Sequence, residues 1–345
     1  MTTFDLGLTS FAETSATGAA ADHGERLRQI VAEIEKAEEV GLDVYGLGEH
    51  HRADMAASAP AITLAAAART TERIRLSSAV IVLSSADPVR TFQDFATLDL
   101  LSEGRAELLV GRGSFIESFP LFGYDLADYD ELFTEKLELL LQIRDHERVT
   151  WSGRFRAPLQ GQAVYPRPQQ DPLPVWIGVG GTPASVVRAG RLGLPLALAI
   201  IGGDPARFRV LAEIYRRALA EHGHDPDAFP LAVHAHGHVA EKDDEAADAV
   251  WPSYQEGMDK IGRERGWPPM TRRQFDAMRS PVGSLVLGSP KTVAAKILRW
   301  REILGIDRFM LHPAGSLPHH LTLQSIELLG TEVGPVVRAG ATILQ

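Results

Sequence analysis

Two kinds of hydrophobic pattern alternate along this chain. Short apolar stretches, such as the late part of residues 75–83, predict buried strands, because a strand covered on both faces is apolar throughout. Segments with apolar residues three or four positions apart, such as residues 25–40, predict amphipathic helices that bury one stripe. The expected strands are residues 4–8, 42–49, 75–83, 106–111, 175–179, 196–201, 231–239 and 307–311.

Strands that alternate with helices over this length predict a (β/α)8 TIM barrel with insertions, in which parallel strands close into a ring. A doubly wound open sheet is the alternative, but no glycine-rich dinucleotide fingerprint follows the first strand. We expect one barrel domain over residues 1–345, with excursions at about 149–174 and 262–288. The first excursion predicts a small hairpin, whereas residues 262–284 show no regular pattern.

Composition narrows the class of protein. The chain has 345 residues, of which 45% are hydrophobic, and a formal net charge of −10 without any basic tract. Nucleic acid and anionic membranes are therefore not expected as partners. The absence of cysteine excludes disulfides, thiol nucleophiles and cysteine-based metal sites. We see neither a secretory signal nor an apolar run of membrane-spanning length, so we expect a cytoplasmic protein.

His50 stands where the second predicted strand ends, at the edge where barrel enzymes carry their reactive groups. Side chains alternate along a strand, so Gly46 and Gly48 share a face with His50, while Glu49 shares the other face with His51. This small-residue face predicts room for something flat and large, and a neutral imidazole beside it can act as general acid or base. The alternative is that the paired histidines only cap the strand.

Two further features follow predicted strands. Arg112 comes after the fourth strand, where a guanidinium could grip a phosphate with two hydrogen bonds. Gly180, Gly181 and Thr182 come after the fifth strand and directly before a helix, where backbone N–H groups and the helix dipole favour an anion. Each has a structural alternative, a surface ion pair for the arginine and a capped turn for the glycines. Together, on adjacent strands, they predict a phosphate-binding end.

Three histidines alternate on the seventh predicted strand and therefore share one face. They are His234, His236 and His238. Such a strand could bind a divalent metal, as in barrel hydrolases. No bridging carboxylate or lysine has an obvious place at a strand end, so we expect no metal. The alternative is that the imidazoles line a wall of the barrel or are hydrogen-bonded within it.

Several motifs, in order, resemble the bacterial luciferase-like flavin monooxygenases. Each motif is weak alone, but their order and spacing over residues 50–113 are specific, and the resemblance runs over nearly the whole chain. The motifs are Glu49-His50-His51, the stretch 79–90, Leu101-Ser-Glu-Gly-Arg105, Val110-Gly-Arg-Gly113, Pro174-Val-Trp-Ile-Gly178 and Gly190-Arg-Leu-Gly-Leu-Pro195.

The resemblance implies a (β/α)8 barrel that binds reduced flavin mononucleotide (FMN), supplied by a separate reductase, and that forms a homodimer. It implies that His50 is the catalytic histidine. It also implies that Ala79 and Val80 form a cis peptide behind the flavin ring. Arg112 matches the family's phosphate-binding arginine. The segment Gly180-Gly181-Thr182 falls where the family holds the phosphate.

The chain departs from the family pattern in two places. Glycines replace the bulkier polar residues that luciferase has at the phosphate loop, so backbone donors would do more of that work. Members of the family carry a long mobile loop after strand seven. Residues 262–284 do not clearly match that loop, which argues against light emission with a long-chain aldehyde. Some relatives use the deazaflavin F420 for hydride transfer, and the sequence does not decide between the two cofactors.

The leading hypothesis is a monooxygenase that uses reduced FMN and O₂ on a small organic substrate. The alternatives are an F420-dependent hydride-transfer enzyme, a metal-dependent hydrolase that uses the seventh strand, and a flavin-binding protein without turnover. The identity of the substrate is not readable. Phe115, Phe119 and Phe122 hint at an apolar one, but these rings could equally belong to the core.

Overall fold

The structure is a computed structural model that describes residues 4–14 and 20–343. Residues 1–3, where we looked for a secretory signal, lie outside this range. The parallel strands follow the order β11-β10-β12-β1-β2-β3-β5-β8-β9, and β9 also pairs with β10. Without β11, this order is the cycle of a (β/α)8 barrel, so the predicted fold class is confirmed. Among the described residues, no helix is long and apolar enough to cross a membrane.

The regular elements follow the predicted alternation of strands and helices. The strands are β1 (Asp5–Ser10), β2 (Val44–Leu47), β3 (Arg75–Ser78), β4 (Ile81–Val82), β5 (Ala106–Gly111), β6 (Arg148–Trp151), β7 (Leu159–Ala163), β8 (Val175–Val179), β9 (Leu196–Ala199), β10 (Leu231–Val239), β11 (Val286–Gly288) and β12 (Arg308–Pro313). The α-helices are α1 (Ala20–Glu39), α2 (Pro60–Ala68), α3 (Pro88–Leu101), α4 (Ser118–Phe122), α5 (Tyr129–Asp145), α6 (Pro183–Arg191), α7 (Arg209–Glu221), α8 (Asp243–Arg265), α9 (Arg272–Arg279), α10 (Pro290–Leu304), α11 (His319–Leu328) and α12 (Gly334–Ile343). Short 3₁₀ segments are η1 (Leu126–Asp128), η2 (Pro205–Phe208) and η3 (Pro226–Ala228), and η4 (Leu329–Val333) is a π-helical segment.

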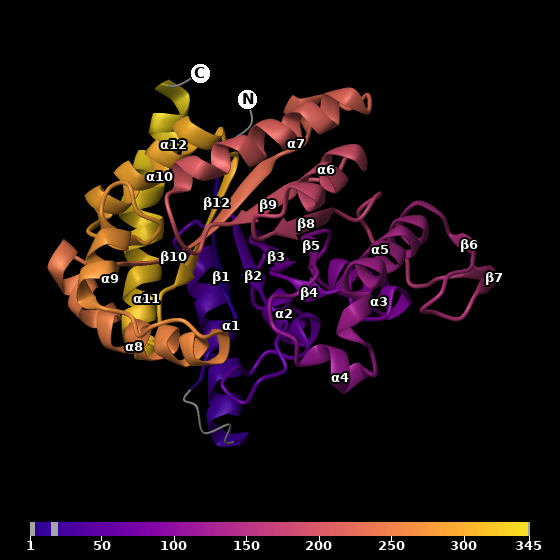
Figure 1. Ribbon diagram of the computed structural model, residues 1–345, viewed down its shortest axis with the longest axis horizontal. Coiled ribbons are helices and arrows are strands. Elements are labelled where there is room, and N and C mark those ends of the chain that lie inside the picture. The colour runs from indigo at the N-terminus through magenta and orange to yellow at the C-terminus, as the bar shows by residue number, and fades with distance from the viewer. Residues whose placement is uncertain (1–3, 15–19, 344–345) are drawn as a thin grey trace. The chain divides into compact units, whose positions relative to one another are not determined.

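The chain divides into two compact units, which we describe separately. The C-terminal unit consists of residues 1–9, 33–44 and 179–345. Its central strand is β10, which pairs with β9 near its start, with β12 along its middle and with β11 at its end. Strand β12 in turn pairs with β1. Figure 1 shows α8 to α12 gathered beside β10 and β12.

The N-terminal unit consists of residues 10–32 and 45–178. Its strand β5 pairs with β3 and β4 on one side and with β8 on the other. The sequence predicts one continuous strand over residues 75–83, and this is wrong in detail. The peptide between Ala79 and Val80 is cis, and it separates β3 from β4.

Helix starts agree with the residues that predict them. Asp87 precedes α3, and its carboxylate accepts hydrogen bonds from the backbone N–H groups of Val89 at 2.9 Å and Arg90 at 3.1 Å. Ser289 caps α10 in the same way. Gly41 follows α1 with a φ of 77°, a conformation that glycine adopts without steric cost. Local chemistry alone therefore places these boundaries.

The first predicted excursion contains an antiparallel hairpin, as expected, formed by β6 and β7. The chain that follows the hairpin is fastened to the end of α5. The guanidinium of Arg167 donates to the carbonyl oxygens of Ile143 and Arg144, each at 2.6 Å. The last carbonyl groups of a helix have no N–H donor within the helix, so the guanidinium of Arg167 supplies the missing hydrogen bonds.

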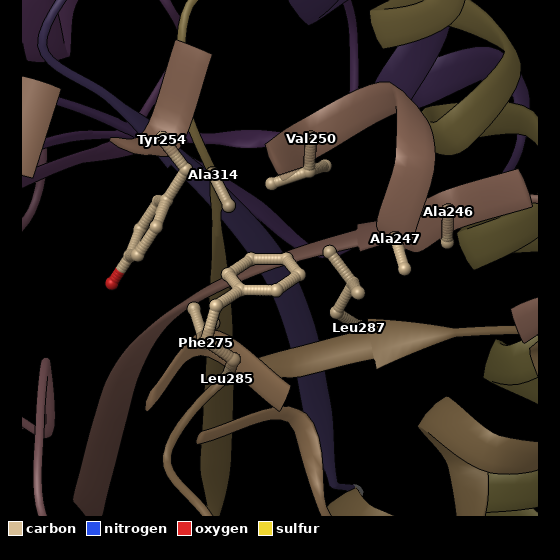
Figure 2. Packing of buried hydrophobic residues seen from close by; sticks show 8 residues of the cluster. All are labelled: Ala246, Ala247, Val250, Tyr254, Phe275, Leu285, Leu287 and Ala314. Atoms are coloured by element: carbon tan, nitrogen blue, oxygen red, sulfur yellow. The ribbon is translucent and has the colours of Figure 1, made fainter. Parts of the chain in front are cut away.

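The expectation of irregular chain over residues 262–284 is wrong. Helix α8 continues to Arg265, and a separate helix, α9, follows. Thr271 and Gln274 form a capping box at the start of α9, a signal that the sequence carries. Phe275 of α9 is fully buried, and apolar side chains of α8 and β11 surround it (Figure 2). This hydrophobic cluster explains why the short strand β11, also missed, forms beside β10.

Candidate active site

His50 lies three residues beyond the end of β2, in the N-terminal unit. Its backbone N–H donates to the carbonyl oxygen of Ala57 at 2.9 Å. Its ring makes edge contacts with Phe11 and Phe115, with ring centroids 4.5 and 5.3 Å away. The two aromatic rings restrict the orientation of the imidazole. A general acid or base must be oriented toward the group with which it exchanges a proton.

The small-residue face of β2 does not leave open space at Gly48. A Cβ atom built there would lie 2.6 Å from the ring of Phe11 and 2.9 Å from the carbonyl oxygen of Ala79. The expectation of a vacant surface for a large flat group is therefore wrong at this position. Glycine is needed at position 48 because the ring of Phe11 occupies the space that a side chain would fill.

Glu49 connects the end of β2 to the strand break. Its backbone N–H donates to the carbonyl oxygen of Val80 at 3.0 Å, and its Oε2 accepts from the backbone N–H of Val82 at 2.9 Å. Its Oε1 lies 2.8 Å from Nε2 of His51. The side chain is buried, so these partners replace the water that the carboxylate loses. The sequence did not predict that Glu49 reaches the strand break, although Glu49 and His51 share a strand face as predicted.

The expected cis conformation of Ala79–Val80 is confirmed. The methyl groups of Val80 lie against two neighbouring strands. Cβ atoms built at Gly111 of β5 and Gly178 of β8 would come within 2.9 and 2.8 Å of those methyl groups. Glycine at both positions leaves room for Val80, so the sequence of two strands, β5 and β8, is fitted to one side chain at the break between β3 and β4.

The loop after β5 is tied back to the end of β2. The guanidinium of Arg52 lies 4.7 Å from the ring centroid of Phe115 and 2.5 Å from the Glu117 carboxylate. Phe115 in turn contacts His50. The loop therefore holds one of the two aromatic rings that contact the imidazole of His50.

Arg112 follows β5, as predicted, and its side chain is partly buried. It forms an ion pair with Asp130, and its guanidinium lies 5.0 Å from the ring centroid of Tyr129. Burial raises the pKa of Tyr129, and its hydroxyl donates to the carbonyl oxygen of Gly113 at 2.6 Å. Asp130 is largely exposed, so this ion pair is weak, and an anion could compete with the carboxylate.

Gly180, Gly181 and Thr182 lie in the C-terminal unit, between β8 and α6. All three are exposed. Cβ atoms built at the two glycines would meet nothing within 4 Å, and Gly181 has a φ of 132°. The side chain of Thr182 does not cap α6. The turn can therefore present backbone N–H groups at a helix start, as predicted, although the helix has only nine residues.

The histidines of β10 meet a residue that the sequence analysis missed. His312 of β12 stands in register with His236, and its ring centroid lies 5.0 Å from that of His236 and 5.1 Å from that of His234. Thr9 of β1 approaches both His234 and His312. A single histidine directly after the eighth predicted strand, residues 307–311, was a weak signal until the register of three strands was known.

Burial alone lowers the pKa of His238 to about 4. It also lowers the pKa of His234 well below its ordinary value, with further contributions from His312 and His236. Burial therefore favours the neutral form of both His234 and His238. Within the described residues, no group of three His, Asp or Glu side chains is placed to hold a metal ion.

Residues 5–308 match the profile of the family described as luciferase-like monooxygenase. This chain belongs to that family. It is therefore an enzyme of the luciferase-like oxidoreductases, which include both monooxygenases and F420-dependent enzymes. The family assignment agrees with the resemblance carried by the motifs around His50.

Two relatives illustrate the range of the luciferase-like family. The N-acetyl-S-alkylcysteine monooxygenase of Bacillus subtilis is 31% identical over 218 residues, which cover 62% of this chain and 62% of that protein. The F420-dependent glucose-6-phosphate dehydrogenase of Amycolatopsis mediterranei is 32% identical over 175 residues, which cover 48% of this chain and 51% of that protein.

Solved structures share the fold. The monooxygenase RslO1 from Streptomyces bottropensis superposes with a TM-score of 0.84 at 22% identity, covering 96% of this chain and 99% of that one. The oxygenating constituent of 3,6-diketocamphane monooxygenase from Pseudomonas putida, solved in complex with FMN, has a TM-score of 0.77 at 21% identity, covering 96% and 98%. At such identities the likeness supports the barrel fold and nothing finer.

Proposed function

We propose that this enzyme is a monooxygenase that uses reduced FMN and O₂ to oxygenate a small organic substrate. The observation that carries the proposal is the setting of His50, an imidazole at the end of a barrel strand with its ring held between Phe11 and Phe115. Membership of the family and the monooxygenase among its relatives support it.

His50 is the proposed acid–base residue. The Phe11 and Phe115 rings restrict its orientation, and the hydrogen bond from its backbone N–H to Ala57 fixes its chain. Reduced FMN, when bound, would supply the activation of oxygen. The protein would exclude water and hold or move a proton at the imidazole of His50.

The donors near two strand ends fit a cofactor phosphate. Arg112 offers a partly buried guanidinium whose present partner is an exposed carboxylate. In the other unit, Gly180 and Gly181 offer backbone N–H groups that no Cβ atom covers. We propose that Arg112 contacts the phosphate and that Ala79 and Val80 contact the flavin ring. The turn at Gly180, Gly181 and Thr182 is proposed, within its own unit, as a phosphate-binding segment.

An F420-dependent hydride-transfer enzyme is the second candidate, since the F420-dependent dehydrogenase of A. mediterranei shares about the same identity as the monooxygenase over a shorter stretch. A metal-dependent hydrolase is no longer supported, because the chain belongs to an oxidoreductase family. A flavin-binding protein without turnover would resemble the monooxygenase in its affinity for flavin and differ in oxygen consumption.

The deciding experiment titrates the protein with FMN, reduced FMN and F420 and follows cofactor fluorescence. Saturable binding of reduced FMN together with oxygen consumption supports the monooxygenase. Preference for F420 without oxygen uptake overturns it in favour of hydride transfer. The variant His50→Asn should keep its cofactor affinity and lose about 10²–10⁴-fold in turnover, which is the usual contribution of a general acid or base.

Partners follow from the same proposal. A separate flavin reductase would supply reduced FMN, and two copies of the chain would form a homodimer. Light scattering after gel filtration tests the dimer directly. Oxygen uptake that depends on added reductase and NAD(P)H tests the supply of reduced flavin.

A further inference from the structure

The two aromatic rings that contact His50 are held in different ways, and the first is held by the barrel itself. The ring of Phe11 lies against the backbone at Gly48, where an added Cβ atom would come within 2.6 Å of it. The carbonyl oxygens of its two chain neighbours accept hydrogen bonds from the backbone N–H groups of Gly48 and Ala56, each at 2.9 Å. Backbone pairing therefore fixes Phe11 to the segment that carries His50.

The second ring, that of Phe115, belongs to a short segment between two anchored points of the N-terminal unit. Before it, the carbonyl oxygen of Gly113 accepts a hydrogen bond of 2.6 Å from the first residue of α5. After it, Phe119 of α4 is fully buried. Ser114 and Ile116, on either side of Phe115, are exposed. The burial of this segment therefore depends largely on the ring of Phe115.

A charged side chain lies against that ring. The guanidinium of Arg52 lies 4.7 Å from the ring centroid of Phe115, and Nη1 of Arg52 donates to the carboxylate of Glu117 at 2.5 Å. Its Nε donates to Asp54 at 3.1 Å, which fixes the plane of the guanidinium. The side chain of Arg52 is 10% exposed. A guanidinium shielded from water attracts an aromatic face more strongly than an exposed one does.

Arg52 and His50 hold the same ring from one short stretch of chain. They are two residues apart, and the stretch is folded by its own hydrogen bonds, from His50 to Ala57 at 2.9 Å and from Met55 to Arg52 at 3.2 Å. Phe115 contacts the guanidinium and also the imidazole, whose ring centroid is 5.3 Å away. Loss of the guanidinium would therefore loosen a ring that restricts the imidazole, without removing any group of His50.

We propose that Arg52 is a positioning residue, which holds the ring of Phe115 against His50 and so keeps the imidazole in one orientation. We call Arg52, Phe115 and Glu117 the Arg52 latch. The proposal rests on the monooxygenase function proposed above and adds a residue to the same site. When the ion pair with Glu117 opens, residues 114–117 can move away from His50. The imidazole then keeps the fixed Phe11 ring on one side and loses the other ring.

The first test measures how well the latch covers His50 in the protein without cofactor. Diethyl pyrocarbonate modifies accessible imidazoles, and peptide mass spectrometry resolves its rate at His50. Arg52→Met keeps the length of the side chain and removes the charge. It should raise that rate about tenfold, which corresponds to the loss of one shielded cation–π contact. Arg52→Lys, which keeps a charge for Glu117, should lie closer to the parent protein. Equal rates in the parent and Arg52→Met overturn the latch.

Arg154 offers a matched control in the same unit. Its guanidinium lies 4.8 Å from the ring centroid of Phe155, and it donates to the carboxylate of Glu131 at 2.5 Å. The same two kinds of contact are therefore present without His50. Arg154→Met should leave the modification rate of His50 unchanged. An equal rise in this variant would indicate a general loosening of the unit and would overturn the specific role of Arg52.

The second test asks whether Arg52 acts through Phe115. Arg52→Met should keep its affinity for FMN and lose about 10–100-fold in turnover, since a small misplacement of a reacting group can cost that much. Phe115→Leu should lower turnover similarly, and the double variant should be no slower than Phe115→Leu alone. Additive losses would show that Arg52 acts by another route and would overturn the proposal.

A milder variant keeps the proposal testable if Arg52→Met does not fold. Glu117→Gln lies at a partly exposed position and leaves the guanidinium on the ring. It should raise the modification rate of His50 and lower turnover in the same direction as Arg52→Met, by a smaller factor. No change in either quantity would contradict the latch.

The modification experiment does not depend on flavin. If the protein binds no flavin while His50 responds to Arg52→Met and not to Arg154→Met, the proposed function fails and the latch remains as a structural contact. If flavin binding and oxygen uptake are intact and His50 does not respond, only the latch fails.

Discussion

The carboxylate of Glu49 accepts a hydrogen bond of 2.9 Å from the backbone N–H of Val82, and this bond joins the end of β2 to β4. The same carboxylate lies 2.8 Å from Nε2 of His51. His50 stands between Glu49 and His51 in the chain, so the position of the proposed acid–base residue depends on a buried carboxylate.

We predict that Glu49→Leu destabilises the protein by about 3 kcal/mol, because it leaves the buried N–H of Val82 without an acceptor. Glu49→Gln keeps one acceptor oxygen and should cost about 1 kcal/mol. Urea unfolding measures both. Glu117→Leu, which removes a partner of Arg52 at a more exposed site, is the control, and an equal loss there would contradict the special role of Glu49.

Gly111→Ala should destabilise the protein by roughly 1–3 kcal/mol, because the new Cβ atom would lie 2.9 Å from a methyl group of Val80. A β-branched side chain has few rotamers with which to avoid the contact. In a Val80→Ala background the same substitution should cost little, and a double-mutant cycle measures the difference. Gly257→Ala, where a Cβ atom meets nothing within 4 Å in the exposed interior of α8, should instead stabilise by about 0.5–1 kcal/mol. An equal cost of Gly111→Ala in both backgrounds would refute the packing argument.

Asp130→Asn should tighten FMN binding severalfold, because Asp130 now occupies the guanidinium of Arg112 that we assign to the phosphate. Arg112→Gln should weaken FMN binding. Riboflavin, which lacks the phosphate, is the matched control ligand and should bind both variants like the parent. If riboflavin and FMN respond alike, Arg112 does not contact the phosphate.

Acid should destabilise the protein through His238, whose pKa burial lowers from the ordinary 6.5 to about 4. Between these values the unfolded chain binds a proton that the folded chain does not, so stability falls as the pH falls from 6.5 to 4. The expected loss is about 3 kcal/mol. His238→Gln should flatten the curve of unfolding free energy against pH in this window, and His320→Gln should not. An unchanged slope in His238→Gln would contradict the assignment.

Regular elements were predicted well where the local chemistry is explicit. Asp87 and Ser289 begin helices that they cap, and β5 and β8 have the predicted bounds. Helix α9 was not predicted, despite its capping box, because the residues that flank this eight-residue helix show no hydrophobic period. Burial of Phe275 is what chiefly stabilises the helix. Short elements that depend on distant packing partners carry little local signal.

The residues of the candidate site also differ in how far the sequence predicts them. His50, Arg112 and the Gly180 turn follow strands as predicted, because strand ends are readable from sequence, and their roles in the site stay predictions. Phe11, Thr9 and His312 were not, since their partners lie far away in the chain and only strand register brings them together. The vacant face expected at Gly48 failed for the same reason, because Phe11 fills it.

By itself, the sequence determined the barrel's alternation of strands and helices, the helix caps and the family motifs. Hydrophobic period, capping chemistry and motif spacing are patterns of residues that lie close together in the chain. Only the tertiary structure decided that Glu49 holds the strand break, that Val80 requires glycine on two other strands, and that Thr9 pairs two histidines. Each of these rests on atoms brought within a few ångströms by strand pairing, and no local pattern encodes such a distance.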